Sequence, residues 1–250
     1  MSGHSKWATI KHKKGAADKA RGKLFAKLIR QVEVAAREGG GELESNATLR
    51  TMYQKARDNS VPLDTIERAI KRGTGELEGV TYEQVTYEGY APHGVAIFVE
   101  ALTDNRNRTG AEIRSVFSKS GGSLAEPGAV AWQFDRKGVV IVPGAVDEDE
   151  LMMAALEAGA EDVVREGEEW QVRTEPTDTM AVRDAIAEAG IEVTSADLTM
   201  LPQNTIELSQ ATEARSVLKV IDALDDHDDV QGVYANLDVP DSVMAELEND

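Results

Sequence analysis

The sequence predicts an α+β multidomain protein, with an N-terminal three-helix bundle and two ferredoxin-like α/β domains, one inserted into the other. Its 250 residues are enough for more than one core, since domains commonly span about 100–200 residues. Between about residues 23 and 73, apolar residues recur with the period of a helix; beyond residue 80, alternation typical of strands becomes frequent. Hydrophobic residues form 41% of the chain, which is adequate for folded cores.

The first helix is expected over about residues 23–38. Its apolar side chains fall on one face, and Lys23, Lys27 and Arg30 fall on the opposite face. The three glycines at 39–41 should end it. This helix therefore presents an ordered basic surface.

Two further helices should complete the bundle. The second is expected over about residues 46–58, with Ser45 or Asn46 as its N-cap. The third begins at Pro62, a favourable residue for a first helical turn, and Gly73 should stop it.

Residues 1–22 are expected to form an extended basic arm with at most one helical turn. They contain three glycines and little apolar periodicity. A single acid, Asp18, stands against the basic residues Lys6, Lys11, Lys13, Lys14, Lys19 and Arg21.

Beyond the bundle, the predicted elements alternate between strands and helices. Residues 138–201 are expected in the order β-α-β-β-α-β, which is ferredoxin-like. The flanking elements are strands at 80–90, 94–102 and 129–134, a helix at 109–119, and a strand, helix and strand between 205 and 237. The last three can complete the sheet that begins at residue 80. The predicted domains are thus 1–75, 80–135 with 205–240, and 136–204, with a peripheral acidic tail after Pro240.

Charge is distributed unevenly along the chain. The formal net charge is −18, yet residues 1–72 hold 16 Lys and Arg against 8 Asp and Glu, a net +8. Residues 73–250 hold 11 Lys and Arg against 37 Asp and Glu, a net charge of −26. Such asymmetry indicates a basic segment for a polyanion on an acidic body that nucleic acid would repel.

The arm is the strongest candidate for nucleic-acid binding. Lysines that neutralise phosphates release counterions and so favour binding. Trp7 and His12 stand among the lysines, and an aromatic ring beside cations can stack on an unpaired base. The alternative is a solvated charged tail without a ligand.

A second polar cluster spans residues 104–109, between a predicted strand and a predicted helix. Asp104 or Asn107 can cap that helix, which explains the polar residues structurally. Arg106 and Arg108, joined by Arg114, can instead bind phosphate with help from the helix N-terminus. Both interpretations stay open.

No feature indicates an enzyme, a metal site or a cofactor. The chain has no cysteine, and its four histidines belong to no catalytic motif. The run 225–229 can hold a divalent cation or be a solvated loop, and the loop is favoured; a nuclease built on Asp104 and Glu112 is a weak alternative. Residues 46–73 match a helix-turn-helix in outline only. Without a secretory signal or a membrane-spanning run, a cytoplasmic protein is expected.

Several motifs together resemble the YebC/PmpR family over essentially the whole chain. They are Gly3-His4-Ser5-Lys6-Trp7, Lys11-His12-Lys13-Lys14, Ala56-Arg57-Asp58-Asn59, Ile66-Glu67-Arg68-Ala69-Ile70-Lys71-Arg72-Gly73, Tyr87-Glu88-Gly89-Tyr90 and Thr103-Asp104-Asn105-Arg106-Asn107-Arg108-Thr109. The turn at 92–94 departs from the glycine-rich turns usual in relatives.

The resemblance implies a helical N-terminal domain, two α/β domains, and a DNA-binding transcriptional regulator. The family also includes a mitochondrial translational activator, and bacterial members are linked to translation on the ribosome. Three hypotheses follow: a non-enzymatic nucleic-acid-binding regulator of gene expression, a ribosome-associated translation factor that binds ribosomal RNA, and an acidic protein-interaction module whose basic arm is incidental. None involves a membrane or a small-molecule substrate.

Overall fold

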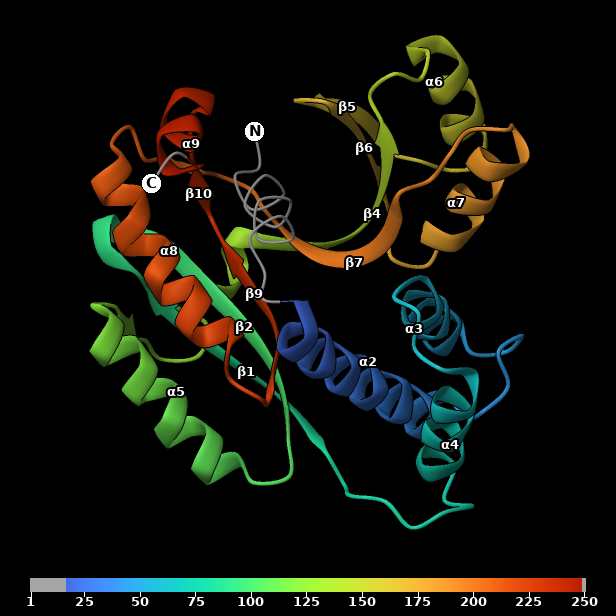
Figure 1. Ribbon diagram of the computed structural model, residues 1–250, viewed down its shortest axis with the longest axis horizontal. Coiled ribbons are helices and arrows are strands. Elements are labelled where there is room, and N and C mark those ends of the chain that lie inside the picture. Colours follow the sequence, from blue (N-terminus) through green and yellow to red (C-terminus); the bar gives the residue numbers. More distant parts are fainter. Residues whose placement is uncertain (1–16, 249–250) are drawn as a thin grey trace. The chain divides into compact units, whose positions relative to one another are not determined.

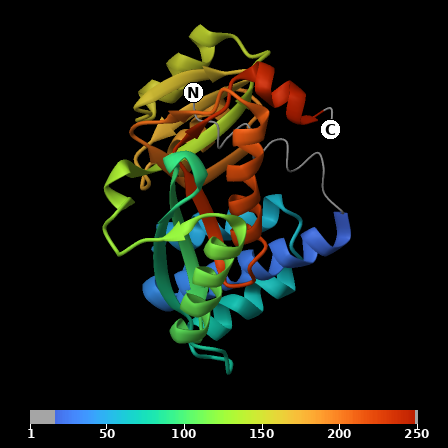
Figure 2. The same cartoon turned by 90° about the vertical axis from the view of Figure 1, so that its left-hand side faces the viewer.

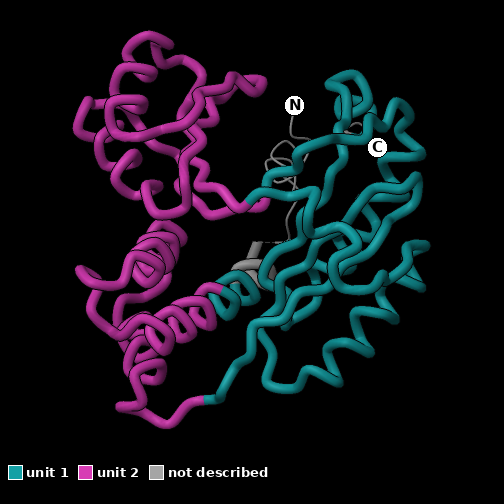
Figure 3. The backbone as a smooth tube through the Cα atoms, turned by 180° about the vertical axis from the view of Figure 1, so that it is seen from behind, with its two compact units in different colours: residues 1–27, 80–135, 201–250 teal, residues 28–79, 136–200 magenta. Residues whose placement is uncertain are grey.

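The computed structural model describes residues 17–248 of a mixed α/β protein with several sheets (Figure 1). The chain divides into two compact units (Figure 3). Unit 1 contains the chain up to residue 27 with 80–135 and the part from 201 onward, and unit 2 contains 28–79 and 136–200. No helix within residues 17–248 combines the length and apolar composition needed to cross a bilayer. The division into three domains predicted from the sequence stays a prediction.

Three helices occupy the N-terminal part: α2 (Ala17–Gly39), α3 (Ala47–Asp58) and α4 (Leu63–Gly73). The prediction that residues 17–22 belong to an extended arm is wrong, since α2 already begins at Ala17. Alanine, lysine and arginine are strong helix formers, so a helix nucleated by the amphipathic stretch extends through them. The apolar faces hold fully buried residues of each helix: Leu28 and Val32 in α2, Leu49 in α3 and Ile66 in α4.

Asn46 joins the end of α2 to the start of α3. Its Oδ1 accepts a hydrogen bond from Leu49 N at 3.0 Å, and its Nδ2 donates to the carbonyls of Ala35 and Gly40, each at 2.8 Å. Of the two caps that the sequence left open, Asn46 is the one used, and Gly40 takes the left-handed conformation expected after a helix end.

Helix α4 ends at Gly73, as predicted, and this glycine has a packing role as well. Its φ is not positive, and a Cβ there would lie 2.4 Å from the carbonyl oxygen of Glu33. The glycine therefore lets α4 approach α2 closely. Glu33 itself is buried and pairs with Arg72 at 2.8 Å and Arg37 at 3.5 Å, so these two arginines neutralise an internal carboxylate.

Unit 2 also contains a four-stranded sheet in the order β5-β6-β4-β7. Two helices, α6 and α7, contribute Leu151, Ala155, Val182 and Ile186 to the core over this sheet. The elements are β4 (Phe134–Pro143), α6 (Glu148–Glu157), β5 (Asp162–Glu166), β6 (Glu169–Thr174), α7 (Thr179–Glu188) and β7 (Ser195–Pro202). The order of these elements, β-α-β-β-α-β, is the one predicted from the sequence, and β5 and β6 flank Gly167.

The sheet of unit 1 has the order β3-β1-β2-β9. Its helices α5 and α8 lie side by side over one face (Figures 1 and 2), where Ile113 and Phe117 meet the buried Ile97 and Val99. The strands are β1 (Glu83–Tyr90), β2 (Ala96–Thr103), β3 (Ser123–Leu124) and β9 (Val230–Ala235), and β8 (Ile206–Glu207) pairs with β10 (Leu237–Asp238). The helices are α5 (Arg106–Ser120), α8 (Ala211–Asp225) and α9 (Asp241–Glu248), with short 3₁₀ turns η1 (Pro92–Gly94) and η2 (Ala131–Gln133).

Two predictions in unit 1 are wrong. Residues 129–134 are not a strand, because η2 occupies residues 131–133 and β4 begins only at Phe134. The tail after Pro240 is not peripheral, since α9 buries Val243 and Met244 in the core of unit 1. Burial of these two apolar side chains stabilises the tail against the core, although most of its other residues are acidic or polar.

Candidate nucleic-acid interface

Much of the predicted interface lies outside the described residues. This applies to His4, Lys6, Trp7, Lys11, His12, Lys13 and Lys14 of the arm. Lys19 and Arg21 lie on α2, where the backbone alone is described. The side chains that can be placed are Lys23, Lys27, Arg30, Arg106 and Arg108.

The two lysines of α2 bind the C-terminal end of α8. Lys23 Nζ contacts the Asp226 carboxylate at 2.5 Å and its carbonyl at 3.0 Å. Lys27 Nζ contacts the Asp225 carbonyl at 2.7 Å and its carboxylate at 3.2 Å. Ammonium groups are favourable at this position, because the last carbonyls of a helix lack intrahelical partners and carry partial negative charge.

These contacts change what the basic face of α2 can do. The hydrogen bond that Lys23 donates to Asp226 raises the pKa of Lys23 above its usual value, so the lysine is charged but its charge is already paired. A phosphate that binds Lys23 or Lys27 must compete with Asp226 or Asp225. Arg30, farther along the same helix, is half-buried and also has a partner.

The N-terminus of α5 is built by a chain of hydrogen bonds that starts at Asn105. Asn105 Oδ1 accepts from Arg108 N at 3.1 Å, so Asn105 is the N-cap, and not Asp104 or Asn107 as predicted. Asn105 N donates to Thr103 Oγ1 at 2.9 Å, and Thr103 Oγ1 lies 2.7 Å from Thr109 Oγ1. Thr109 in turn donates to the carboxylate of Asp229 at 2.7 Å. Since Thr109 has one proton and gives it to Asp229, Thr103 must be the donor in the bond between the two hydroxyls.

Arg108 completes this arrangement. Its Nη2 lies 2.9 Å from Oδ2 of the buried Asp229 and 3.0 Å from Oδ1 of Asp104. The bond to Asp229 holds the pKa of Arg108 above its usual value. A buried carboxylate needs such a partner, so the contacts favour the structural interpretation of Arg108.

Arg106 differs from Arg108. It is exposed and forms no hydrogen bond or ion pair with another described residue. Farther along α5, Arg114 and Lys119 are also exposed and have no ion-pair partner among residues 17–248. Glu112 is the single acid of this helix. The exposed side of α5 is therefore an ordered surface of unit 1 on which several basic groups are available to a polyanion.

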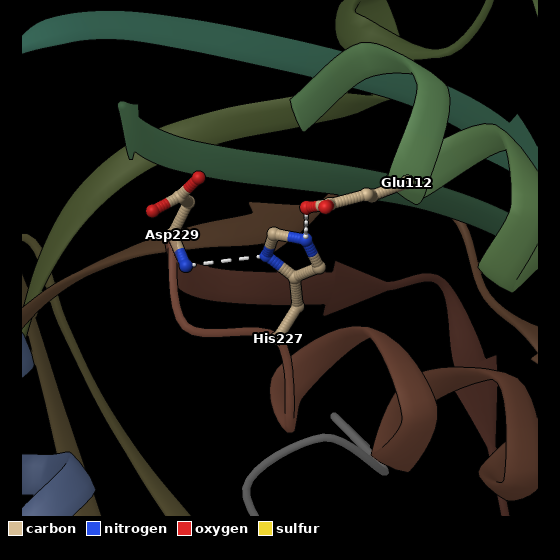
Figure 4. Close-up of side chains that lie close together, drawn as sticks. All are labelled: Glu112, His227 and Asp229. Carbon is tan, nitrogen blue, oxygen red and sulfur yellow. Dashed lines mark hydrogen bonds and ion pairs between the residues drawn. The ribbon is translucent and has the colours of Figure 1, made fainter. Parts of the chain in front are cut away.

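Glu112 faces His227, next to Asp229 (Figure 4). His227 Nδ1 accepts from the backbone N–H of Asp229 at 3.2 Å, so the neutral ring carries its proton on Nε2, which contacts Glu112 Oε2 at 2.9 Å. Potential ligand atoms of the three residues lie within 4.8 Å of one another. However, both ring nitrogens are used within the protein, and Asp229 Oδ2 is bound by Arg108 and Thr109. The contacts support a structural link between α5 and the loop after α8. They also occupy Glu112 and Asp229, two of the acids predicted as possible nuclease or cation ligands.

Another exposed group, Trp132 in η2, was not predicted from the sequence. Its side chain is 66% exposed, and its Nε1 donates to the carbonyl of Ala129 at 3.1 Å. The turn is fixed by the buried carboxylate of Glu88, which accepts from the backbone N–H groups of Gly128, Val130 and Ala131 at 2.6, 2.7 and 2.8 Å. Trp132 is thus an aromatic ring presented on an ordered turn, with its polar atom already satisfied.

Two domain models of one protein family match most of the chain. Residues 5–76 match the TACO1/YebC protein N-terminal domain, and residues 82–237 match the TACO1/YebC second and third domain. A protein of Halothermothrix orenii named "Probable transcriptional regulatory protein" is 57% identical over 99% of both chains. A protein of Rubrobacter xylanophilus with the same name is 59% identical, again over 99% of both chains.

A solved structure supports the same relationship. The crystal structure of a conserved hypothetical protein from Aquifex aeolicus is 46% identical and superposes with a TM-score of 0.80, over 90% of this chain and 93% of that one. The two family matches, the high identities and the shared fold agree with one another. The chain therefore belongs to the TACO1/YebC family.

Proposed function

We propose that this protein is a non-enzymatic, DNA-binding regulator of gene expression that acts in the cytoplasm. The observation that carries the proposal is the separation of charge: a net +8 in residues 1–72 on a body of net −26. The names of the relatives support transcription as the process. The arm supplies the main phosphate contacts, and Arg106, with Arg114 and Lys119, supplies a second basic surface on α5.

The proposal assigns different roles to the predicted site residues. Lys11, Lys13 and Lys14 contact phosphate, while Lys23 and Lys27 join only when the acidic end of α8 releases them. Trp7 or His12 stacks on an unpaired base where the target offers one.

The test is equilibrium binding of a fluorescent promoter duplex to the purified full chain over a range of salt. Replacing Lys11, Lys13 and Lys14 with alanine should weaken binding and lower the salt slope by about 2–3, since each duplex phosphate contact contributes about 0.9. A matched control removes three positive charges elsewhere, at Arg136, Arg183 and Lys219. Equal affinity and slope for the arm variant and the wild type would contradict the proposal.

A second candidate function is a ribosome-associated translation factor. The supporting observation is that Trp7 and His12 stand among lysines, a combination that suits unpaired bases of structured RNA as well as a duplex. In-cell crosslinking followed by sequencing of the attached nucleic acid separates the two. Recovery of ribosomal RNA would favour translation, and recovery of promoter DNA would favour transcription.

We also infer a domain plan for the α/β part. The order β5-β6-β4-β7, with α6 and α7 contributing to one core, supports a ferredoxin-like domain over residues 136–204, inserted into an α/β domain formed by 80–135 and 205–240. The buried faces of α2, α3 and α4 support a three-helix bundle. Limited proteolysis that releases a stable fragment of residues 136–204 would support this plan, and cleavage within that range first would oppose it.

A further inference from the structure

Helix α6 leaves three large apolar side chains in solvent. Leu151 and Ala155 face the core over the sheet, whereas Met152, Met153 and Leu156 are 36%, 66% and 44% exposed. Residues three and four apart are neighbours on a helix, so Leu156 adjoins both methionines. These three residues are here called the α6 apolar patch; their clustering on one helix distinguishes them from the scattered apolar residues of an ordinary surface.

The α6 apolar patch is surrounded by uncompensated acids. Glu148, Asp149, Glu150 and Glu157 are exposed, and none forms an ion pair with another described residue. Residues 136–200 together contain 5 basic and 16 acidic residues, a net charge of −11. Such a field repels nucleic acid and anionic membranes, so neither fits this surface.

The chemistry of the surface points to one kind of occupant. Methionine side chains are flexible and polarizable, and they adapt to varied apolar partners. A cationic amphipathic helix offers an apolar stripe for such a surface and positive charges for its rim. If a second copy of this chain bound through the same surface, its four acidic residues would face the four acidic residues of the first copy and repel them.

We propose that the α6 apolar patch and its acidic rim are a docking surface for a cationic amphipathic helix of another protein. This role is separate from nucleic-acid binding by the basic segment and gives the acidic α/β part a function of its own. A regulator built in this way contacts nucleic acid with one part and a basic protein with another.

The test uses the full chain and a labelled 18-residue peptide of leucine and lysine arranged with helical period. A scrambled peptide of the same composition has the same charge but no apolar stripe. The expected result is binding of the helical peptide and weakening by about tenfold in Met153→Ser/Leu156→Ser, because truncating central apolar contacts at interfaces commonly costs this much. The matched control is Leu63→Ser, since Leu63 is similarly exposed, at 43%, on a different helix.

The charge contribution needs its own pair of variants. Glu150→Gln/Glu157→Gln should weaken binding and reduce its salt dependence, whereas Glu188→Gln/Glu192→Gln, in exposed residues of the same segment, should do so less. Equal affinity for the helical and scrambled peptides would overturn the proposal, as would full binding by Met153→Ser/Leu156→Ser. Self-association of the wild type that this double variant abolishes would assign the surface to a second copy instead. DNA binding is measured on the same variants, so failure here is distinguishable from failure of the proposed function.

Discussion

Replacing Glu88 with glutamine should detach the turn that carries Trp132. The Glu88 side chain is 5% exposed, and its carboxylate is the shared acceptor for three backbone N–H groups. A glutamine keeps the shape but has one acceptor oxygen. If that oxygen stays beside Val130 N and Ala131 N, the new NH₂ group faces the N–H of Gly128, and two donors oppose each other.

The size of the effect follows from these contacts. An unsatisfied buried donor costs about 1–3 kcal/mol, and the two remaining bonds lose the charge of their acceptor. We expect the free energy of unfolding to fall by about 2–3 kcal/mol in total. For a protein of this size that lowers the Tm by roughly 5–10 °C.

Thermal unfolding followed by circular dichroism measures this change, with Glu83→Gln as the control. Glu83 lies exposed on the same strand, so its replacement should leave the Tm almost unchanged. A Tm of Glu88→Gln within about 1 °C of the control would refute the structural role assigned to Glu88.

The pH dependence provides an independent check. Burial raises the pKa of Glu88, but the hydrogen bonds from Gly128, Val130 and Ala131 together outweigh it, so the pKa is lowered overall. A lowered folded-state pKa means that the stabilisation is present above the unfolded value of about 4.3 and disappears as pH falls through the folded value. The stability gap between wild type and Glu88→Gln should therefore be full at pH 7 and shrink below about pH 4.3. A gap that stays constant to pH 3 would contradict this account.

Three other substitutions test separate parts of the structure. Gly138→Ala should lower the free energy of unfolding by about 1–3 kcal/mol, because the added Cβ would lie 1.9 Å from Thr179 Oγ1; urea titration measures it. His93→Gly should raise stability by about 0.5–1 kcal/mol in the same assay, because His93 has a φ of +64° that glycine adopts without strain. Asp226→Asn should release Lys23 and steepen the salt slope of DNA binding by up to about 0.9; an unchanged slope would mean that Lys23 does not reach phosphate.

Patterns within a short stretch of sequence were enough to predict elements that are determined by neighbouring residues, such as helix caps and strands on either side of a glycine. The strands β5 and β6 flank a glycine, and Asn46 has the side chain and position of a cap. Family motifs supplied the identity of the chain. The basic residues of the candidate interface were also visible in the sequence, as a charge imbalance.

Long-range contacts decided what the sequence could not show. Residues 129–134 have the composition of a strand, but Glu88, some forty positions earlier, draws the N–H groups of this segment into a turn. Likewise Arg106 and Arg108 look equivalent in the sequence. The pairing of β9 with β2 brings Asp229 beside α5. Asp229 forms an ion pair with Arg108, whereas Arg106 stays exposed.

The same kind of contact limits how much of the basic charge is available to nucleic acid. Of the 16 basic residues before residue 73, Arg37 and Arg72 neutralise Glu33, and Lys23 and Lys27 bind the acidic end of α8. A phosphate that binds Lys23 or Lys27 must therefore displace Asp226 or Asp225, whereas binding through Arg106 on α5 displaces no described hydrogen-bond or ion-pair partner. The α2 pairs are partly exposed, and such pairs are worth little individually, so a polyanion can replace them at modest cost. When a phosphate replaces Asp225 or Asp226 at a lysine, the freed carboxylate attracts cations from solution, which offsets the counterions released from DNA. The measured salt slope should therefore be smaller than the number of lysines suggests. Variants that remove these carboxylates should show the slope expected for all the lysines.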